Sequence, residues 1–282
     1  MGFKTILVPL DSGELNEALL ATALTAAQRF QAHIEVLYVR PSHDDIVRYG
    51  TAGLSDSMKK TVMEATERGA SEQANAVRKA FEKFCREHKV TIADKPPASA
   101  TATAAWREET AGSDALVRRG RLSDLIFVMR PGDSTAAAET FETALLETGR
   151  PVVVVPPTPQ ECIATRITIG WNASAEAARA VAEAIPCLAS ADAVTVLASE
   201  KRTANAQELA EYLGWHGIKP TVKIFEAGSR SVGETLLAES RQLGADLLVI
   251  GGYTHTRARQ LLFGGVTRHV FEAADIPVMM AH

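Results

Sequence analysis

A glycine-rich stretch near the end of the chain holds the residues best suited to binding an anion. The apolar run 247–250 is followed by Gly251 and Gly252, and a second pair, Gly264 and Gly265, precedes another periodic run. This order predicts a buried strand, a loop and the start of a helix, whose backbone N–H groups attract anions. The same glycines fit a second interpretation, close packing of the strand against a helix.

Cationic side chains lie in the same stretch. Arg257, Arg259 and Arg268 could neutralise a phosphate chain, and His255 or His269 could donate further hydrogen bonds. For each of these residues the alternative is a solvated position in a basic loop. The stretch is therefore a candidate phosphate site, with simple strand and helix packing as the competing interpretation.

Catalytic and metal-binding patterns are missing from the sequence. It has no G-x-S-x-G nucleophile elbow, no G-x-x-x-x-G-K-[ST] phosphate loop and no H-E-x-x-H pair. His43, Asp44 and Asp45 are adjacent polar residues, which are far more often solvated than metal-bound. We therefore predict no catalytic residues and no metal site, and binding is favoured over catalysis.

Length and composition indicate two globular domains. The chain has 282 residues, 46% of them hydrophobic, and its 34 acidic residues slightly outnumber 30 basic ones. A formal charge of −4 argues against nucleic acid and anionic membranes as partners. No apolar run approaches the ~20 residues that cross a bilayer, and the N-terminus lacks a signal-peptide pattern, so we expect a cytoplasmic protein. Cys85, Cys162 and Cys187 are widely spaced and read as reduced thiols.

The elements that must position the glycine-rich stretch alternate between strands and helices. Strands are predicted at 4–10, 33–39, 99–106, 124–129 and 151–155, and again at 166–171, 192–198, 221–226, 247–250 and 276–281. Helices are predicted near 18–27, 57–88, 114–121, 175–189, 204–215 and 232–243. The proline-rich segment 156–163 is the natural linker between the two halves.

The two halves read as copies of one domain. Placing Asp11 over Asn172 also aligns Ile6 with Ile167, so we predict domains at 1–157 and 164–282. The first copy carries extra residues, most of them in the long predicted helix. After its fourth strand it retains only Gly132 and then an alanine-rich segment that favours a helix. We therefore expect any ligand to bind only in the second copy.

The spacing of the final loop resembles that of the universal stress protein family. The family pattern is Gly-x2-Gly-x9-Gly-Ser/Thr, and Gly251, Thr254, Gly264 and Gly265 stand at the matching positions. The resemblance covers nearly the whole chain as a tandem pair. It implies an α/β fold of two flavodoxin-like, adenine-nucleotide-binding-like domains, each a five-stranded parallel sheet flanked by helices.

The resemblance also implies a cofactor and a set of binding residues. The implied cofactor is ATP with Mg²⁺, with Trp171 and Asn172 bordering the adenine. The residues implied around the ribose and phosphates are Gly251, Thr254, Gly264, Gly265, Val266 and Thr267.

Three of these positions depart from the family. Thr254 replaces a glycine, Gly265 replaces the phosphate-binding hydroxyl, and Asn172 stands where the family has aspartate. Losing one hydrogen bond to a charged phosphate weakens binding about ten- to hundredfold. We therefore expect modest affinity.

By this resemblance the chain is a stress-response protein that binds a small ligand, an adenine nucleotide being the candidate, in its C-terminal domain and acts through a protein partner. One alternative is a slow ATPase or nucleotide-handling enzyme that uses Arg257 or Arg259 electrostatically, and another is a structural adaptor with a vestigial pocket. We also predict an internal pseudo-dimer joined through the last strands, 152–155 and 278–281, because both are apolar and family dimers join there. A homodimer of whole chains stays open.

Overall fold

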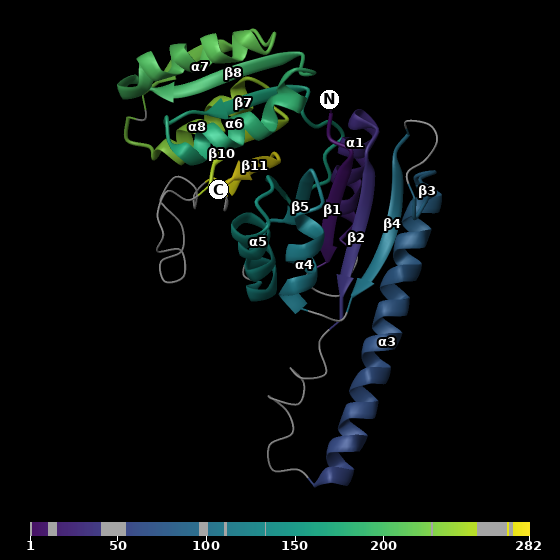
Figure 1. The fold of residues 1–282 in the computed structure, drawn as a ribbon. Coiled ribbons are helices and arrows are strands. Elements are labelled where there is room, and N and C mark those ends of the chain that lie inside the picture. Colours follow the sequence, from purple (N-terminus) through teal and green to yellow (C-terminus); the bar gives the residue numbers. More distant parts are fainter. Residues whose placement is uncertain are drawn as a thin grey trace.

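Two α/β repeats follow one another along the chain (Figure 1). The computed structural model describes residues 2–10, 16–40, 55–95, 101–109, 112–132, 134–226, 228–252, 270 and 273–282. Among the described helices, none is long and apolar enough to cross a bilayer. The fold is thus the predicted α/β class, with parallel strands flanked by helices.

The first repeat contains the predicted strands and helices and one additional short strand. Its elements are β1 (Thr5–Leu10), α1 (Glu17–Phe30), β2 (His33–Val39), α3 (Asp56–Glu87), β3 (Thr91–Ile92), β4 (Thr103–Glu109), α4 (Gly112–Gly120), β5 (Leu125–Met129), α5 (Thr135–Glu147) and β6 (Val152–Val155). The strand expected at 99–106 begins and ends later, because β4 pairs with the whole length of β2, from His33 opposite Thr103 to Val39 opposite Glu109.

The second repeat has the same alternation without the long helix. Its elements are β7 (Arg166–Gly170), α6 (Ala175–Leu188), β8 (Ala193–Ser199), the 3₁₀ turn η1 (Glu200–Arg202), α7 (Thr203–Trp215), β9 (Thr221–Phe225), α8 (Val232–Gln242), β10 (Leu247–Gly251) and β11 (Val278–Ala281). Of the helix expected after Gly265, Val270 is described, and it is helical and buried.

The strands of both repeats form one 11-stranded sheet in the order β3-β4-β2-β1-β5-β6-β11-β10-β7-β8-β9. Strands within each repeat are parallel, and the repeats meet through the antiparallel pair β6 and β11, in which Val153 lies opposite Met279. All residues of both strands are buried. The predicted internal pseudo-dimer is therefore present, and the pairing of its last strands joins the two sheets into one.

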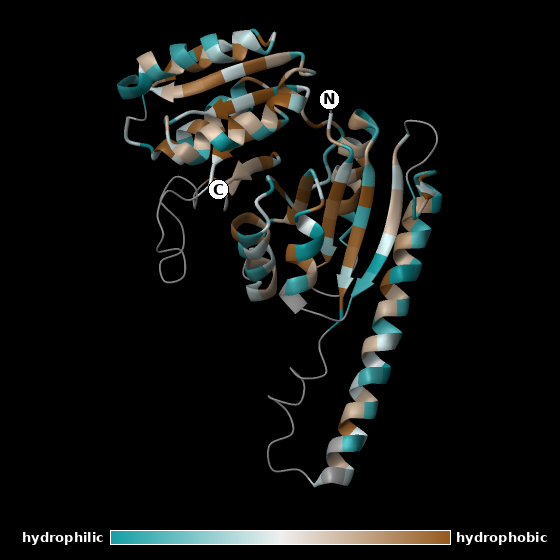
Figure 2. Ribbon diagram, viewed as in Figure 1, coloured by the Kyte–Doolittle hydropathy of each residue, from teal (hydrophilic) through white to brown (hydrophobic). Residues whose placement is uncertain are grey.

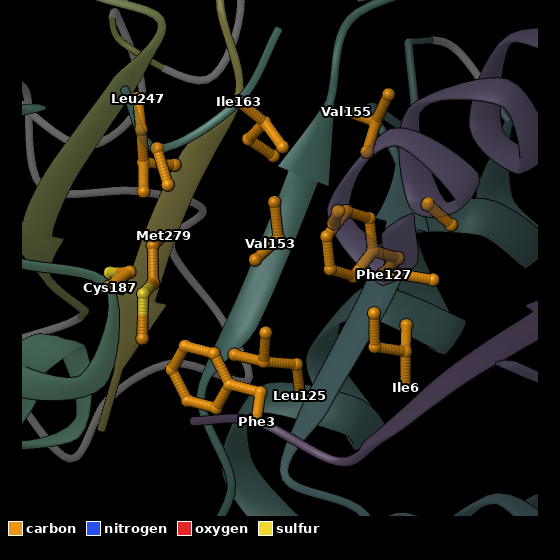
Figure 3. Close-up of a cluster of buried hydrophobic side chains, with 14 of the residues drawn as sticks. Phe3, Ile6, Leu125, Phe127, Val153, Val155, Ile163, Cys187, Leu247 and Met279 are labelled. Atoms are coloured by element: carbon orange, nitrogen blue, oxygen red, sulfur yellow. The ribbon is translucent and has the colours of Figure 1, made fainter. Parts of the chain in front are cut away.

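The core runs without interruption across this seam. Figure 3 shows Val153 and Met279 side by side, with Phe127 from the first repeat and Leu247 from the second packed around them. On this face the sheet is covered by α1, α3, α6 and α7, and on the other face by α4, α5 and α8. Burial of apolar area is the main favourable term, so the seam is part of the core and not a contact between two separate domains.

An aspartate ties the start of the first strand to the sheet in each repeat. Asp124 Oδ2 accepts hydrogen bonds from the first two backbone N–H groups at the start of β1, at 2.7 and 3.0 Å. Asp246 Oδ1 accepts from the N–H groups of Thr165 and Arg166, both at 2.9 Å. The sequence repeat therefore preserves a structural hydrogen-bonding role for this aspartate.

The long helix α3 projects well beyond the sheet (Figure 1). It begins at Ser55, whose side chain accepts a hydrogen bond from the Met58 N–H. Its described side chains become fully buried only from Ala74 onward, and the ribbon in Figure 2 has both hydrophilic and hydrophobic residues along the projecting part. Only the C-terminal half of α3 is thus packed on the core.

Candidate functional site

The candidate site lies at the carboxyl ends of β7 and β10, which are neighbours in the sheet. Gly170 at the end of β7 pairs with Ile250 of β10. From β7 the chain crosses through α6 to β8 on the opposite side from β10, so this edge is the topological switch point where α/β sheets bind ligands. Trp171 and Asn172 directly follow β7, and Gly251 ends β10. Three of the predicted binding residues therefore converge there.

The remaining predicted binding residues lie outside the described residues. They are Thr254, Gly264, Gly265, Val266 and Thr267, together with the basic residues of the same stretch. The phosphate-binding part of the site stays a prediction from the sequence.

Gly251 and Gly252 allow close backbone packing. A Cβ on Gly251 would lie 2.5 Å from the backbone nitrogen of Ala177 in α6, which is closer than real Cβ contacts come. Gly252 donates its N–H to the Ala281 carbonyl at 2.7 Å, and a Cβ there would lie 2.9 Å from the same oxygen. For these two glycines the packing interpretation is sufficient, because the strand could not approach its neighbours with a larger residue.

The Trp171 ring is held between three elements. Its backbone N–H donates to Leu197 at the end of β8, and its indole Nε1–H donates to the Asn205 carbonyl of α7 at 3.0 Å. The side chain is half-buried against the core. A fixed, half-buried indole is well suited to contact a flat base.

Asn172 forms part of the turn into α6. Its Oδ1 accepts a hydrogen bond from the Ser174 N–H at 3.0 Å, and the intervening Ala173 has a φ of 60°. The Asn172 Nδ2 group is a donor that an aspartate at this position would lack, while Oδ1 already accepts one hydrogen bond within the turn.

A carboxylate already occupies the N-terminus of α6. Glu176 lies in the first turn, after the Ser174 cap, and its side chain is 15% exposed. A backbone hydrogen bond at its own amide lowers the pKa of Glu176, aided by the Ser174 side chain and the charges of Arg179 and His282. The attraction of this helix N-terminus for an anion is thus satisfied by the protein itself.

Two further carboxylates lie on the same edge. Glu200 directly follows β8 and Glu226 directly follows β9, and these strands are parallel neighbours. The pKa of Glu200 is raised because its protonated carboxyl donates a hydrogen bond to Glu226 and because the charge of Glu226 disfavours a second carboxylate. Together with Glu176 they place three carboxyl groups on the described part of this edge, where Arg179 pairs with Glu176 at 3.4 Å and Lys201 and Arg202 directly follow Glu200.

The equivalent edge of the first repeat is built differently. After β5 ends at Met129, the helix α5 begins at Thr135, with Ser134 accepting from the Ala137 N–H as its cap. The predicted replacement of the loop by a helix is confirmed. Arg130 points across the seam, and its Nη1 donates to the Ala274 carbonyl of the second repeat at 2.9 Å.

Other reactive groups show no sign of a second chemical centre. Within the described residues no cluster of metal-ligating side chains occurs, and His43, Asp44 and Asp45 lie outside them. All three cysteines are free thiols. Burial raises the pKa of Cys85 to about 11 and that of Cys187 to about 12, whereas Cys162 is exposed.

Sequence reasoning missed the three carboxylates, although the sequence carries signals for them. Glu176 follows a serine helix cap within the first helical turn, where acidic residues are favoured. Glu200 and Glu226 each stand one residue after a strand, and the ends of neighbouring parallel strands meet at one edge. An inventory of the residues that follow each strand would have found the pair.

The fold is that of a tandem α/β protein, and the candidate site lies at the topological switch point of its second repeat. The model of the Universal stress protein family matches residues 2–156 and 164–282, so the chain belongs to the universal stress protein family as a tandem member. This membership supports a role in the response to stress.

Solved structures with the same fold span the whole chain. A universal stress protein from Archaeoglobus fulgidus DSM 4304 is 15% identical, with a TM-score of 0.69 over 99% of this chain and 97% of the other. A protein of unknown function from Pseudomonas aeruginosa PAO1 is also 15% identical, with a TM-score of 0.54 over 98% and 92%. At these identities the likeness concerns the fold alone. Among the curated proteins no significant match is found.

Proposed function

We propose that this tandem universal stress protein binds a small ligand at the carboxyl edge of β7 and β10 and passes its bound state to a protein partner. The first candidate ligand is an adenine nucleotide, and we propose the cytoplasm as its location. The observation that supports the proposal is the meeting of Trp171, Asn172 and Gly251 at the switch point of the second repeat.

Each of these residues has a role in the proposed binding. The Trp171 indole, fixed by its hydrogen bond to Asn205, packs against the base, and Asn172 Nδ2 donates to a base nitrogen. The phosphates then lie toward the glycines at 264 and 265, where backbone N–H groups and neighbouring arginines neutralise them. Mg²⁺ would arrive with the phosphates, since it keeps waters and few protein ligands.

The carboxylates at this edge favour a second candidate, an adaptor with a vestigial pocket. Glu176, Glu200 and Glu226 oppose a polyphosphate, whereas a nucleoside meets little of this repulsion. The two candidates therefore predict different affinities for Mg-ATP and for adenosine. A nucleotide-binding protein prefers Mg-ATP to adenosine, and a vestigial pocket binds neither.

Calorimetry on three proteins tests the proposal. Mg-ATP should bind wild type at one site per chain, and Gly264→Val should abolish binding by filling the space that the phosphates need. Gly214→Val is the matched control in the same repeat, because a Cβ at Gly214 has nothing within 4 Å. Gly132 is unsuitable as a control, since its φ of 53° strains any larger residue.

The possible results separate the candidates. Two sites per chain, or equal binding by Gly264→Val, would contradict ligand binding in the second repeat alone. No heat with Mg-ATP or adenosine would favour the adaptor. Phosphate released during incubation of the same samples would favour a slow ATPase.

A further inference from the structure

A pocket lies at the opposite edge of the sheet from the candidate site, where the two repeats meet. Its volume is about 540 Å³, and it is close to the end marked N in Figure 1. Its lining residues are Gly2, Lys4, Arg29 and Phe30 from the first repeat and Ile185, Pro186, Ala189 and Ser190 from the second. Lys4 precedes β1, so the pocket faces the amino ends of the strands and is separate from the candidate nucleotide edge.

Among the described residues, the charged side chains that line this pocket, Lys4 and Arg29, are both cationic. Arg29 Nη2 donates to the Ser190 carbonyl at 2.6 Å, and Lys4 Nζ donates to the Phe30 carbonyl at 3.4 Å. Within the described residues neither side chain forms an ion pair with a carboxylate. Arg29 has five N–H donors, so most of them stay available to a ligand.

The helix ends at the pocket reduce this positive charge without cancelling it. Both α1, which ends at Phe30, and α6, which ends at Leu188, present their C-termini there. Each helix end carries about −0.5 of a charge, so two cations leave roughly one net positive charge. Asp124 does not line the pocket, and its Oδ2 is committed to the backbone of Lys4 and to Thr5.

An apolar wall faces the two cations. Phe30, Ile185 and Pro186 are all half-buried, and Pro186 has no N–H to offer a ligand. The Phe30 ring is held edge-on against Phe3 at a centroid distance of 5.3 Å. A volume of about 540 Å³ lies within the usual range for small-molecule sites.

We propose that this inter-repeat pocket binds an organic carboxylate with a flat apolar body. The carboxylate pairs with Arg29 and Lys4, and the apolar body packs on Phe30, Ile185 and Pro186. Arg29 keeps its hydrogen bond to Ser190 while its other donors contact the ligand. Because both repeats supply contacts, the bound ligand stabilises the association of the two repeats, which also meet at the seam between β6 and β11.

Titration of the full chain with 1-naphthoate, followed by ligand fluorescence, tests the pocket. We expect one site per chain, and at least tenfold weaker binding of the uncharged analogue 1-naphthamide. The double variant Lys4→Gln, Arg29→Gln should bind 1-naphthoate at least tenfold more weakly than wild type. Lys60→Gln on the projecting part of α3, where the side chain is 79% exposed, is the matched control and should bind like wild type.

A second variant tests the same pocket if the double variant fails to fold. Ala189→Glu places an opposing carboxylate on the exposed rim without removing an existing contact, and it should also prevent binding. Equal binding by wild type and these variants, equal binding of the amide, or no binding of 1-naphthoate would overturn the proposal. Displacement of 1-naphthoate by saturating Mg-ATP would also overturn it, by locating the probe at the nucleotide edge.

Discussion

At the scale of single residues, carboxylates lie at both edges of the sheet. Asp124 and Asp246 hold the first strands at the amino edge, while Glu176, Glu200 and Glu226 lie at the carboxyl edge of the second repeat. The sequence pointed to the switch-point position of Trp171 and Asn172, because residues that follow a first strand are easily recognised. It did not reveal that the Asn172 oxygen is used within its own turn, because that depends on the positive φ of Ala173.

The Glu200 and Glu226 pair should reduce stability at neutral pH. The folded-state pKa of Glu200 is raised, so the folded protein retains a proton that the unfolded chain has lost. Stability therefore falls as pH rises from the ordinary glutamate value of 4.5 through the folded pKa, and stays lower above it.

We expect Glu200→Gln to raise the melting temperature at pH 7, with the difference from wild type disappearing below pH ~4 as both carboxyls become protonated. Thermal melts across this range measure the effect. If Glu200→Gln raised the melting temperature equally at every pH, the cause would not be the interaction between the Glu200 and Glu226 carboxyl groups.

The aspartate at the start of β10 should contribute measurably to stability. Asp246→Ala leaves the N–H groups of Thr165 and Arg166 without their carboxylate acceptor, and hydrogen bonds to charged groups are worth roughly 1.5–3 kcal/mol. Urea unfolding should show a loss of about that size. Asp192→Ala, at an exposed position, is the control and should change the free energy of unfolding by less than about 0.5 kcal/mol.

At the scale of elements, apolar periodicity located every strand except the short β3, and the shifted bounds of β4 are instructive. β4 was expected to end at Trp106 but continues through Arg107 and Glu108 to Glu109. Charged residues rarely indicate a strand. Here they are paired, since Arg107 binds Glu35 of β2 and Glu108 pairs with Arg40, so the strand continues despite its polarity. Such pairing across strands depends on the register and cannot be read from one segment.

The projecting half of α3 should be the less stable half. None of its described side chains before Ala74 is fully buried, and a helix with little tertiary packing is marginal in water. Hydrogen exchange should therefore be faster over residues 58–73 than over 74–87. Gly69→Ala has open space for its methyl group and should slow exchange in the projecting half by stabilising the helix by about 0.5–1 kcal/mol. Uniform exchange along α3 would contradict this view.

At the scale of the whole molecule, the two repeats bury each other's last strand at the seam between β6 and β11. The pairing was predictable from two apolar strands, each at the end of a repeat, because an exposed apolar edge is unfavourable. The hydrogen bond from Arg130 to the Ala274 carbonyl across the seam was not predictable, because it forms only when the two repeats meet.

Residues 160–282 expressed alone should therefore self-associate. Without β6, the buried strand β11 becomes an open edge, and Met279 and Met280 lose their partners Val153 and Val152. Light scattering should give the mass of a dimer or larger species, with the full chain as the reference. A well-folded monomer at high concentration would show that the seam is dispensable.

The covalent connection between the two seam strands also has an evolutionary consequence. In a symmetric pair made from one repeat, every substitution is inherited twice, and a change that removes a loop removes both loops together. Fusion of two copies into one gene ends that constraint. One repeat here carries the long α3 and the helix α5, while the other kept its glycine-rich segment. The gene duplication thus let the two copies diverge while the interface that joins them stayed intact.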